Sequence, residues 1–222
     1  MNVFHRFNSI IPNDFHSLDI HIETPGTLDQ YLVSTKCFTV KNLSVSGLID
    51  KRDFATIKQQ KYLRKIDLSR ASIMPYNDNE KNRLPMDAFR GCKKITEILL
   101  PENLECISSQ AFHKCYNIKK IEIPKTVKSI GYLAFNMCRN LEHIKFHENL
   151  KHIGFMCFLG CKKLNCIDLR TQDAIQFDFN TPIFEEANHR NCILKVKNGL
   201  AEKFSKAEQW CNFRHIEEIN FE

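Results

Sequence analysis

Cysteine and histidine are the residues of this sequence whose side chains could bind a metal ion or act as nucleophile and base. The chain of 222 residues has ten cysteines and nine histidines. Four of the cysteines recur at one fixed 23-residue interval, at Cys92, Cys115, Cys138 and Cys161. One cysteine per repeat indicates a packing position, so we expect these four to be buried, reduced and able to donate S–H to a backbone carbonyl in the turn. Disulfides between them are not expected, because equivalent side chains in stacked coils run parallel.

The other six cysteines follow no zinc-binding spacing, and the sequence has no Cys-x-x-Cys pair. They are Cys37, Cys106, Cys157, Cys166, Cys192 and Cys211. Cys157 occupies the alanine position of its repeat, which indicates a small core residue. Cys166 and His143 should be neighbours on an open strand face, where a nucleophilic dyad would lack a third orienting group and an oxyanion site. The sequence therefore predicts no metal ion, no cofactor and no catalytic residue.

A 23-residue repeat predicts the elements that carry these side chains. Phenylalanine precedes each repeating cysteine, at Phe89, Phe112, Phe135 and Phe158. After each cysteine comes an apolar frame such as Ile-x-x-Ile-x-Leu at 95–100, which predicts a short strand with alternate side chains buried. Proline and glycine after the strand, as at Pro124 and Gly131, predict turns.

The same interval extends upstream of these repeats. It separates the frames at 40–45 and 63–68, and it also separates Ile20 from Leu43. Between 63–68 and the next frame the chain has nine extra residues, and the polar segment near 74–83 accounts for them. We expect this segment to be a surface loop inserted into one coil.

We expect one leucine-rich-repeat domain over residues 1–222, with about nine rungs. Its parts are an N-terminal cap and first coil (1–39), regular 23-residue repeats (40–169) with the insertion near 74–83, and irregular C-terminal coils with a cap (170–222). Two last strands are expected at 193–196 and 216–221, because terminal coils must close the core.

The repeat unit resembles that of a known family. Residues 123–144 read Ile-Pro-x-x-Val-x-x-Ile-Gly-x-x-Ala-Phe-x-x-Cys-x-x-Leu-x-x-Ile, which is similar to the BspA-like subclass of leucine-rich repeats from bacteria of the Bacteroides type. The fold class we expect is an α/β solenoid, a right-handed superhelix with one parallel β-sheet on the concave side and short turns or helical turns outside. The resemblance also implies a secreted or cell-surface protein used in adhesion or host-protein binding.

Charge and apolar content exclude some classes of protein. The net charge of +6 is only mildly basic, and the long lysine and arginine runs of many nucleic-acid binders are missing. No stretch approaches the roughly 18 to 20 consecutive apolar residues that cross a bilayer, and residues 1–15 lack the pattern of a secretory leader. Localisation stays open, since the resemblance implies the cell surface while a cysteine-rich core is compatible with a reducing environment.

The outward positions of the predicted strands form the candidate binding surface, which we call the strand face. Two lines of side chains should lie on it: Lys65, Glu97, Lys120, His143 and Cys166, and beside them Asp67, Leu99, Glu122, Lys145 and Asp168. Opposite charges should pair across strands, Glu97 with Lys120 and Glu122 with Lys145. The mixed charge favours a protein or glycan ligand, whose identity the sequence does not predict; nor does it predict the oligomeric state.

Basic residues around the repeating cysteine should line one edge of the sheet, which we call the basic rim. They are Arg90, Lys93, Lys94, His113, Lys114, Arg139, Lys162 and Lys163. Two interpretations are open: a solvated edge, or a rim that binds an acidic glycan, an acidic protein patch or nucleic acid. No aromatic residues are expected among them, which disfavours nucleic acid. The sequence thus favours a non-catalytic protein-binding or adhesion scaffold, with the rim as the alternative binding site.

Overall fold

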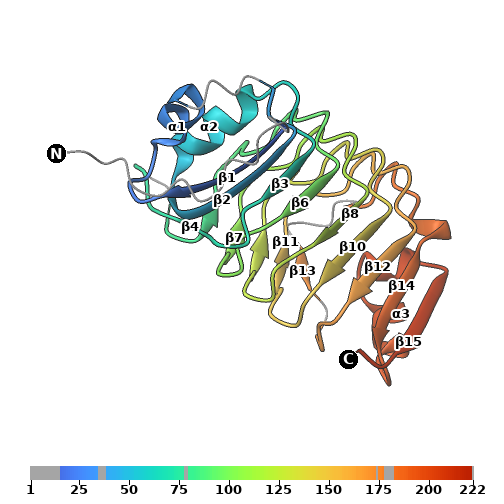
Figure 1. The fold of residues 1–222 in the computed structure, drawn as a ribbon. Helices are drawn as coiled ribbons and strands as arrows, with labels where there is room; N and C mark the ends of the chain where they lie inside the picture. The colour runs from blue at the N-terminus through green and yellow to red at the C-terminus, as the bar shows by residue number, and fades with distance from the viewer. Residues whose placement is uncertain (1–15, 35–38, 78–79, 174, 178–182, 222) are drawn as a thin grey trace.

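The chain forms an elongated stack of coils, which runs from the N-terminal coils at one end (blue) to the C-terminal coils at the other (red; Figure 1). The computed structural model describes residues 16–34, 39–77, 80–173, 175–177 and 183–221. Each coil contributes one short strand to a main row of parallel strands, and neighbouring coils bury the apolar side chains between them. This is the repeat solenoid with parallel sheets that the sequence predicts.

In the described part of the chain the main row contains nine strands, as expected from the repeat count. One sheet has the order β1 (Ser17–Ile22), β2 (Asn42–Ile49), β3 (Lys65–Asp67) and β6 (Glu97–Leu99). A second sheet continues the row with β8 (Lys120–Glu122), β10 (His143–Phe146), β12 (Cys166–Leu169), β14 (Ile193–Lys197) and β15 (His215–Ile219), and β6 lies beside β8 in Figure 1. The predicted C-terminal strands are thus confirmed. The hand of the superhelix and the concavity of this face stay predictions.

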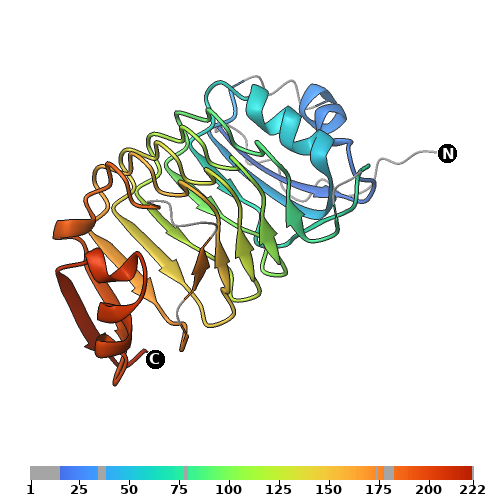
Figure 2. The same cartoon turned by 180° about the vertical axis from the view of Figure 1, so that it is seen from behind.

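The prediction of a single sheet is wrong, because a second row of strands runs along the other side of the coils (Figures 1 and 2). Its members are β5 (Arg83–Leu84), β7 (Cys106–Ile107), β9 (Ser129–Ile130), β11 (His152–Ile153) and β13 (Gln176–Phe177), all parallel. The turn after the main strand redirects the chain, and the next apolar pair is again extended. Its backbone groups then pair with the coils above and below, as buried backbone groups must.

The first coils differ from the rest because helices replace the outer turns. These are α1 (Leu28–Ser34) and α2 (Lys51–Gln59), and the strand β4 (Ala71–Ile73) pairs with the end of β2. Asp50 is the N-cap residue of α2, and it forms a capping box with Asp53. Buried Asp53 also accepts hydrogen bonds from the backbone N–H of Gly26 (2.7 Å) and Leu28 (3.0 Å), which ties α1 to α2. Among the described residues, no helix has the length and apolar character needed to cross a bilayer.

Register and spacing also depart from the 23-residue pattern at the N-terminal end. Ile20 pairs with Val45, and not with Leu43 as the repeat interval predicts. A shift of two residues keeps the same side chains inward, so Ile20 and Ile22 are still buried. The insertion near 74–83 lies between β4 and β5 as a connection with turns, and its residues 78–79 lie outside the described part of the chain.

A row of stacked phenylalanine rings runs through the core along the axis of the stack. Ring centroids are 5.4 Å apart for Phe89 and Phe112, 4.9 Å for Phe112 and Phe135, and 5.5 Å for Phe135 and Phe158. Phe184 extends the row at 5.5 Å, although it lies outside the 23-residue spacing. The row ends against Phe54 of α2 at one end and against Trp210 and Phe213 at the other. Spacings of this size are favourable for offset aromatic rings.

The repeating cysteines form a second row beside the phenylalanines, and three of the four thiols donate to a carbonyl in the preceding coil. The bonds run from Cys115 Sγ to Phe89 O (3.0 Å), from Cys138 Sγ to Phe112 O (3.2 Å) and from Cys161 Sγ to Phe135 O (3.2 Å). These three side chains are fully buried, whereas Cys92, at the start of the row, is half-buried. All described cysteines are free thiols, and Cys157 is buried as predicted; Cys37 lies outside the described residues.

Glycine is required in the turns for a different reason from the one the sequence suggests. A Cβ atom at Gly154 would lie 2.5 Å from the backbone nitrogen of Tyr132, and one at Gly131 would lie 2.6 Å from that of Ser109. The missing side chain therefore allows successive coils to approach, with Gly154 N–H donating to Ile130 O at 2.7 Å. The sharp bends are made by other residues with positive φ at the 23-residue interval, Asp87, Gln110, Leu133 and Met156.

Replacing Gly154 with alanine should lower the free energy of unfolding by about 1 to 3 kcal/mol, because the new methyl group overlaps backbone that cannot turn aside. Thermal or urea unfolding measures the change. Ser108→Ala is the matched control, since this equivalent position of an earlier coil already carries a Cβ atom, and it should stay within about 0.5 kcal/mol of the parent. Equal stability of the Gly154→Ala variant would contradict the close approach of the coils.

The thiol row should make stability fall at alkaline pH. Burial raises the pKa of Cys138 well above its usual range. The pKa of this thiol in the folded protein exceeds its unfolded value of about 8.5. Its contribution to the free energy of unfolding is therefore complete below about pH 8.5. As the pH rises above that value, this contribution is lost at about 1.4 kcal/mol per pH unit. Cys138→Ala should therefore show a shallower loss of unfolding free energy above about pH 9. Cys211→Ala, at an exposed thiol, should keep the parent slope. If the unfolding free energy of the parent and of both variants falls with pH at the same slope, burial does not raise the pKa of the Cys138 thiol.

Candidate binding face and basic rim

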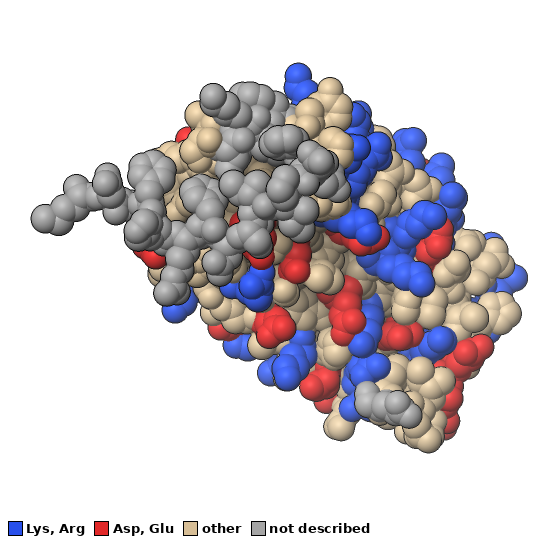
Figure 3. Space-filling model, viewed as in Figure 1, with Lys and Arg blue, Asp and Glu red and all other residues tan. Residues whose placement is uncertain are grey.

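The ten predicted residues of the strand face come together on the outer side of the main row. Parallel pairing places Lys65 beside Glu97 and Asp67 beside Leu99. It also aligns Lys120, His143 and Cys166 in one line and Glu122, Lys145 and Asp168 in the next. All ten are exposed or half-buried, because the inward positions between them supply the core. Acidic and basic side chains alternate over this face (Figure 3).

Ion pairs neutralise part of this charge within the face. Lys65 Nζ lies 2.8 Å from Glu97 Oε2, and Lys145 Nζ lies 2.7 Å from Glu122 Oε1. The predicted pair of Glu97 with Lys120 is wrong, because Glu97 turns toward the coil on its other side. Within the described part of the chain no carboxylate lies within ion-pair distance of Lys120. Lys120 is therefore a cation that a ligand can use.

One large apolar side chain interrupts the charges of the strand face. Leu99 of β6 is 57% exposed, next to Asp67 in the parallel ladder. Single exposed leucines are common on protein surfaces. Here the side chain lies on a rigid polar face, and the neighbouring strand β8 carries the unpaired Lys120, so adjacent strands offer a ligand both an apolar group and a free cation.

Three groups with metal-binding or nucleophilic chemistry meet at the half-buried end of the strand face. His143 Nε2 lies 3.4 Å from Asp168 Oδ1, and Cys166 Sγ lies 3.6 Å from the same oxygen. The expectation that no third group accompanies Cys166 and His143 is therefore wrong. Two residues further along β12, Asp168 points to the same side of the sheet. Burial and then Asp168 raise the pKa of Cys166 to about 11, so its thiol is protonated at neutral pH, unlike a nucleophilic cysteine.

The basic rim lies along the edge where the main strands begin, and Figure 3 shows lysine and arginine gathered there. Its exposed members are Arg90, Lys93, Lys94, Lys114, Arg139, Lys162 and Lys163. His113 does not belong to it, because its side chain is buried and its pKa is lowered by that burial and by Lys114. The spacing of the repeat does not predict that this side chain is buried.

Aromatic rings are interleaved in the basic rim, contrary to expectation. Lys93 Nζ lies 5.6 Å from the ring centre of Tyr116, and the guanidinium of Arg139 lies 5.0 Å from it. Lys94 lies 5.2 Å from the ring of Tyr62. At exposed sites such cation–π contacts attract a basic side chain to the ring by about 0.5 to 1 kcal/mol. Tyr116 directly follows the repeating cysteine, so its position in the repeat could have revealed it.

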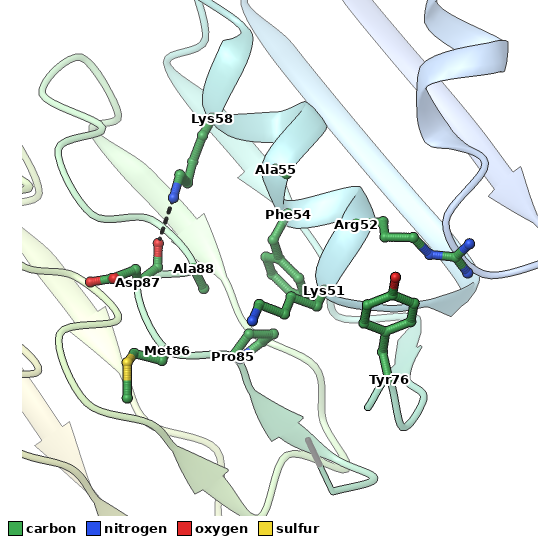
Figure 4. Close-up of a pocket in the computed structure, with 10 residues that line it drawn as sticks. All are labelled: Lys51, Arg52, Phe54, Ala55, Lys58, Tyr76, Pro85, Met86, Asp87 and Ala88. Carbon is green, nitrogen blue, oxygen red and sulfur yellow. Dashed lines mark hydrogen bonds between the residues drawn. The ribbon is translucent and has the colours of Figure 1, made fainter. Parts of the chain in front are cut away.

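A hollow near the N-terminal end is formed by parts that the sequence did not place together (Figure 4). It has a volume of about 240 Å³ and lies between α2, Tyr76 of the inserted loop and the segment from Pro85 to Ala88. Lys58 Nζ donates to Asp87 O at 3.1 Å, and Arg52 lies 4.8 Å from the ring centre of Tyr76. Small-molecule sites are usually larger, about 300 to 1,000 Å³. Two of its basic groups, Arg52 and Lys58, are therefore already engaged within the protein.

Comparison with known proteins identifies the repeat. The profile of the BspA type leucine-rich repeat region matches residues 77–195 in six copies, which is more than half of the chain. A search of curated proteins finds no match.

Several solved structures are similar to this chain at low identity. A leucine-rich repeat protein from T. pallidum is 22% identical, with 72% of this chain and 60% of that chain covered and a TM-score of 0.43. One from Bacteroides ovatus is 20% identical, covers 64% and 54%, and has a TM-score of 0.40. A leucine-rich cell surface protein from Faecalibacterium prausnitzii is 13% identical, covers 83% and 74%, and has a TM-score of 0.35. The chain spans less than two thirds of the length of the first two.

Proposed function

Because the chain belongs to the BspA-type leucine-rich repeat family, we propose that it is a non-catalytic scaffold that binds a protein or a polar glycan on the strand face. The observation that carries the proposal is the parallel register, which fixes ten outward side chains on one surface while the core is satisfied without them. Repeat proteins use such rigid, extended faces for recognition.

The composition of the strand face favours one kind of ligand. The ion pairs Lys65–Glu97 and Lys145–Glu122 leave one lysine, Lys120, against two aspartates, Asp67 and Asp168, so a uniform polyanion gains little from this surface. Leu99 of β6 offers an apolar contact, and Lys120 of the neighbouring strand β8 offers an unpaired cation. A protein or glycan surface with both apolar and acidic groups is complementary to this pair.

The basic rim is the alternative site, for an acidic glycan or nucleic acid. Its favourable feature is the tyrosine ring of Tyr116 held between Lys93 and Arg139, since basic grooves with aromatic rings can bind charged polymers. For a ligand on the strand face, the same charges would raise the association rate and make it sensitive to salt. An adhesion role at the cell surface or in a secreted form is the biological setting that we propose, following the family.

Substitution of the two central residues tests the strand face directly. Leu99→Ser combined with Lys120→Gln should weaken binding by about tenfold or more, because it removes the apolar anchor and the free cation together. Both side chains are exposed, so the unfolding midpoint should stay close to that of the parent. The purified chain is first applied to protein and glycan arrays, and the affinity for each ligand found is then measured for parent and variant.

Two further variants separate the surfaces. Lys151→Gln removes an exposed lysine beside the second row of strands and should leave affinity unchanged. Lys162→Gln with Lys163→Gln removes two rim charges and should lower only the association rate and its salt dependence. If the rim variant abolishes binding while the Leu99 and Lys120 variant binds normally, the strand face is the wrong surface and the rim is the site.

A further inference from the structure

We propose that His143, Cys166 and Asp168 form a binding site for a single divalent transition-metal ion, with Zn²⁺ preferred and water as the fourth ligand. The three residues come from adjacent strands β10 and β12 on the strand face. The proposal concerns a site that sequence spacing did not predict, since no Cys-x-x-Cys or histidine pair marks it. It does not depend on the ligand-binding function proposed above.

The distances between the three ligand atoms match a tetrahedral zinc centre. With usual Zn–N, Zn–O and Zn–S bond lengths, the edges of a tetrahedron are about 3.4 Å between nitrogen and oxygen and about 3.6 Å between sulfur and oxygen. The structure has 3.4 Å between His143 Nε2 and Asp168 Oδ1 and 3.6 Å between Cys166 Sγ and Asp168 Oδ1. All three atoms lie within 4.8 Å of one another, so the third pair, nitrogen and sulfur, is also close enough for one ion to lie between them.

The imidazole of His143 supplies a second observation. Its Nε2 atom is buried, and within the described part of the chain it has no hydrogen-bond partner, although Asp168 is near. Buried polar atoms without a hydrogen-bond partner are uncommon in folded proteins, so such an atom indicates a missing ligand or another specific cause. A metal ion between Nε2, the Asp168 oxygen and the Cys166 sulfur would accept the lone pair of the Nε2 atom. Because all three residues are only half-buried, water can reach the cluster and complete the coordination.

The donor set selects the ion. Thiolate, imidazole and carboxylate together suit the borderline character of Zn²⁺, whereas Mg²⁺ and Ca²⁺ prefer sites made of oxygen alone. One thiolate and one carboxylate balance the charge of a divalent ion. Binding replaces the thiol proton of Cys166, which passes to solvent, so no redox step is involved. Asp168 has a lysine beside it on each neighbouring strand, Lys145 and Lys195, and Lys145 is already engaged with Glu122.

The surrounding strands hold the ligands and restrict the site to one place in the stack. His143 and Cys166 are direct partners in the parallel ladder, and Asp168 lies two residues further on the same strand. The coils on either side carry different groups at these positions, Lys120 with Glu122 before the site and Ile193 with Lys195 after it. A repeat fold thus provides a rigid frame in which a single coil can acquire a metal site.

Metal titration of the intact chain tests the proposal. Calorimetry with Zn²⁺ should show one site with an affinity in the micromolar range or tighter. Co²⁺ should give the visible bands of a tetrahedral ion and a sulfur-to-cobalt charge-transfer band. Cys166→Ser should remove the charge-transfer band, and Asp168→Asn should weaken Zn²⁺ binding by at least about tenfold.

Matched controls come from residues of the same kinds outside the cluster. His215→Gln changes an exposed histidine two strands away, and Cys211→Ser changes an exposed thiol; both should leave binding and spectra unchanged. Circular dichroism of every variant confirms that the fold is kept. Binding that persists in both Cys166→Ser and Asp168→Asn, the absence of Zn²⁺ binding in the parent, or Co²⁺ spectra without sulfur ligation would each overturn the proposal.

Discussion

Burial of each coil by the next is the constraint on which the rest of the structure depends. A single coil has one phenylalanine and one cysteine facing inward, and neither is covered until the neighbouring coils are in place. The ring of Phe135 is stacked between Phe112 and Phe158, and the thiol of Cys161 reaches back to the Phe135 carbonyl. These contacts fix the distance between coils. The caps at both ends, Phe54 of α2 and Trp210 near the C-terminus, cover the rings that would otherwise be exposed.

The same constraint leaves the strand face free to vary. The inward residues of each strand must be apolar and of similar size, whereas the outward residues face solvent and can vary without disturbing the core. The outward residues of adjacent coils therefore differ in kind: Lys120 and Glu122 are followed by His143 and Lys145, then by Cys166 and Asp168. Any recognition or metal chemistry has to be built from these positions. The rigidity of the core then holds them in register.

The sequence predicted the parts of the structure that repeat and missed those that do not. The 23-residue period located the strands, the buried cysteines and both lines of the strand face, because equivalent positions have equivalent surroundings. The second row of strands was missed because two-residue strands are too short to show alternation, and α2 because its coil is unique. Side-chain partners were also beyond reach: Glu97 turns to Lys65, and Asp168 joins His143, through choices of rotamer that spacing does not specify.

Equilibrium unfolding followed by independent probes tests the central prediction, that the coils form one cooperative domain. Trp210 is the single tryptophan and reports on the C-terminal cap, far-ultraviolet circular dichroism reports on the whole stack, and labelling of Cys115 reports on its middle. If each coil depends on its neighbours, the three probes should give one urea midpoint and one slope. A Trp210 transition at clearly lower urea than the labelling of Cys115 would contradict the prediction and divide the chain into separate units.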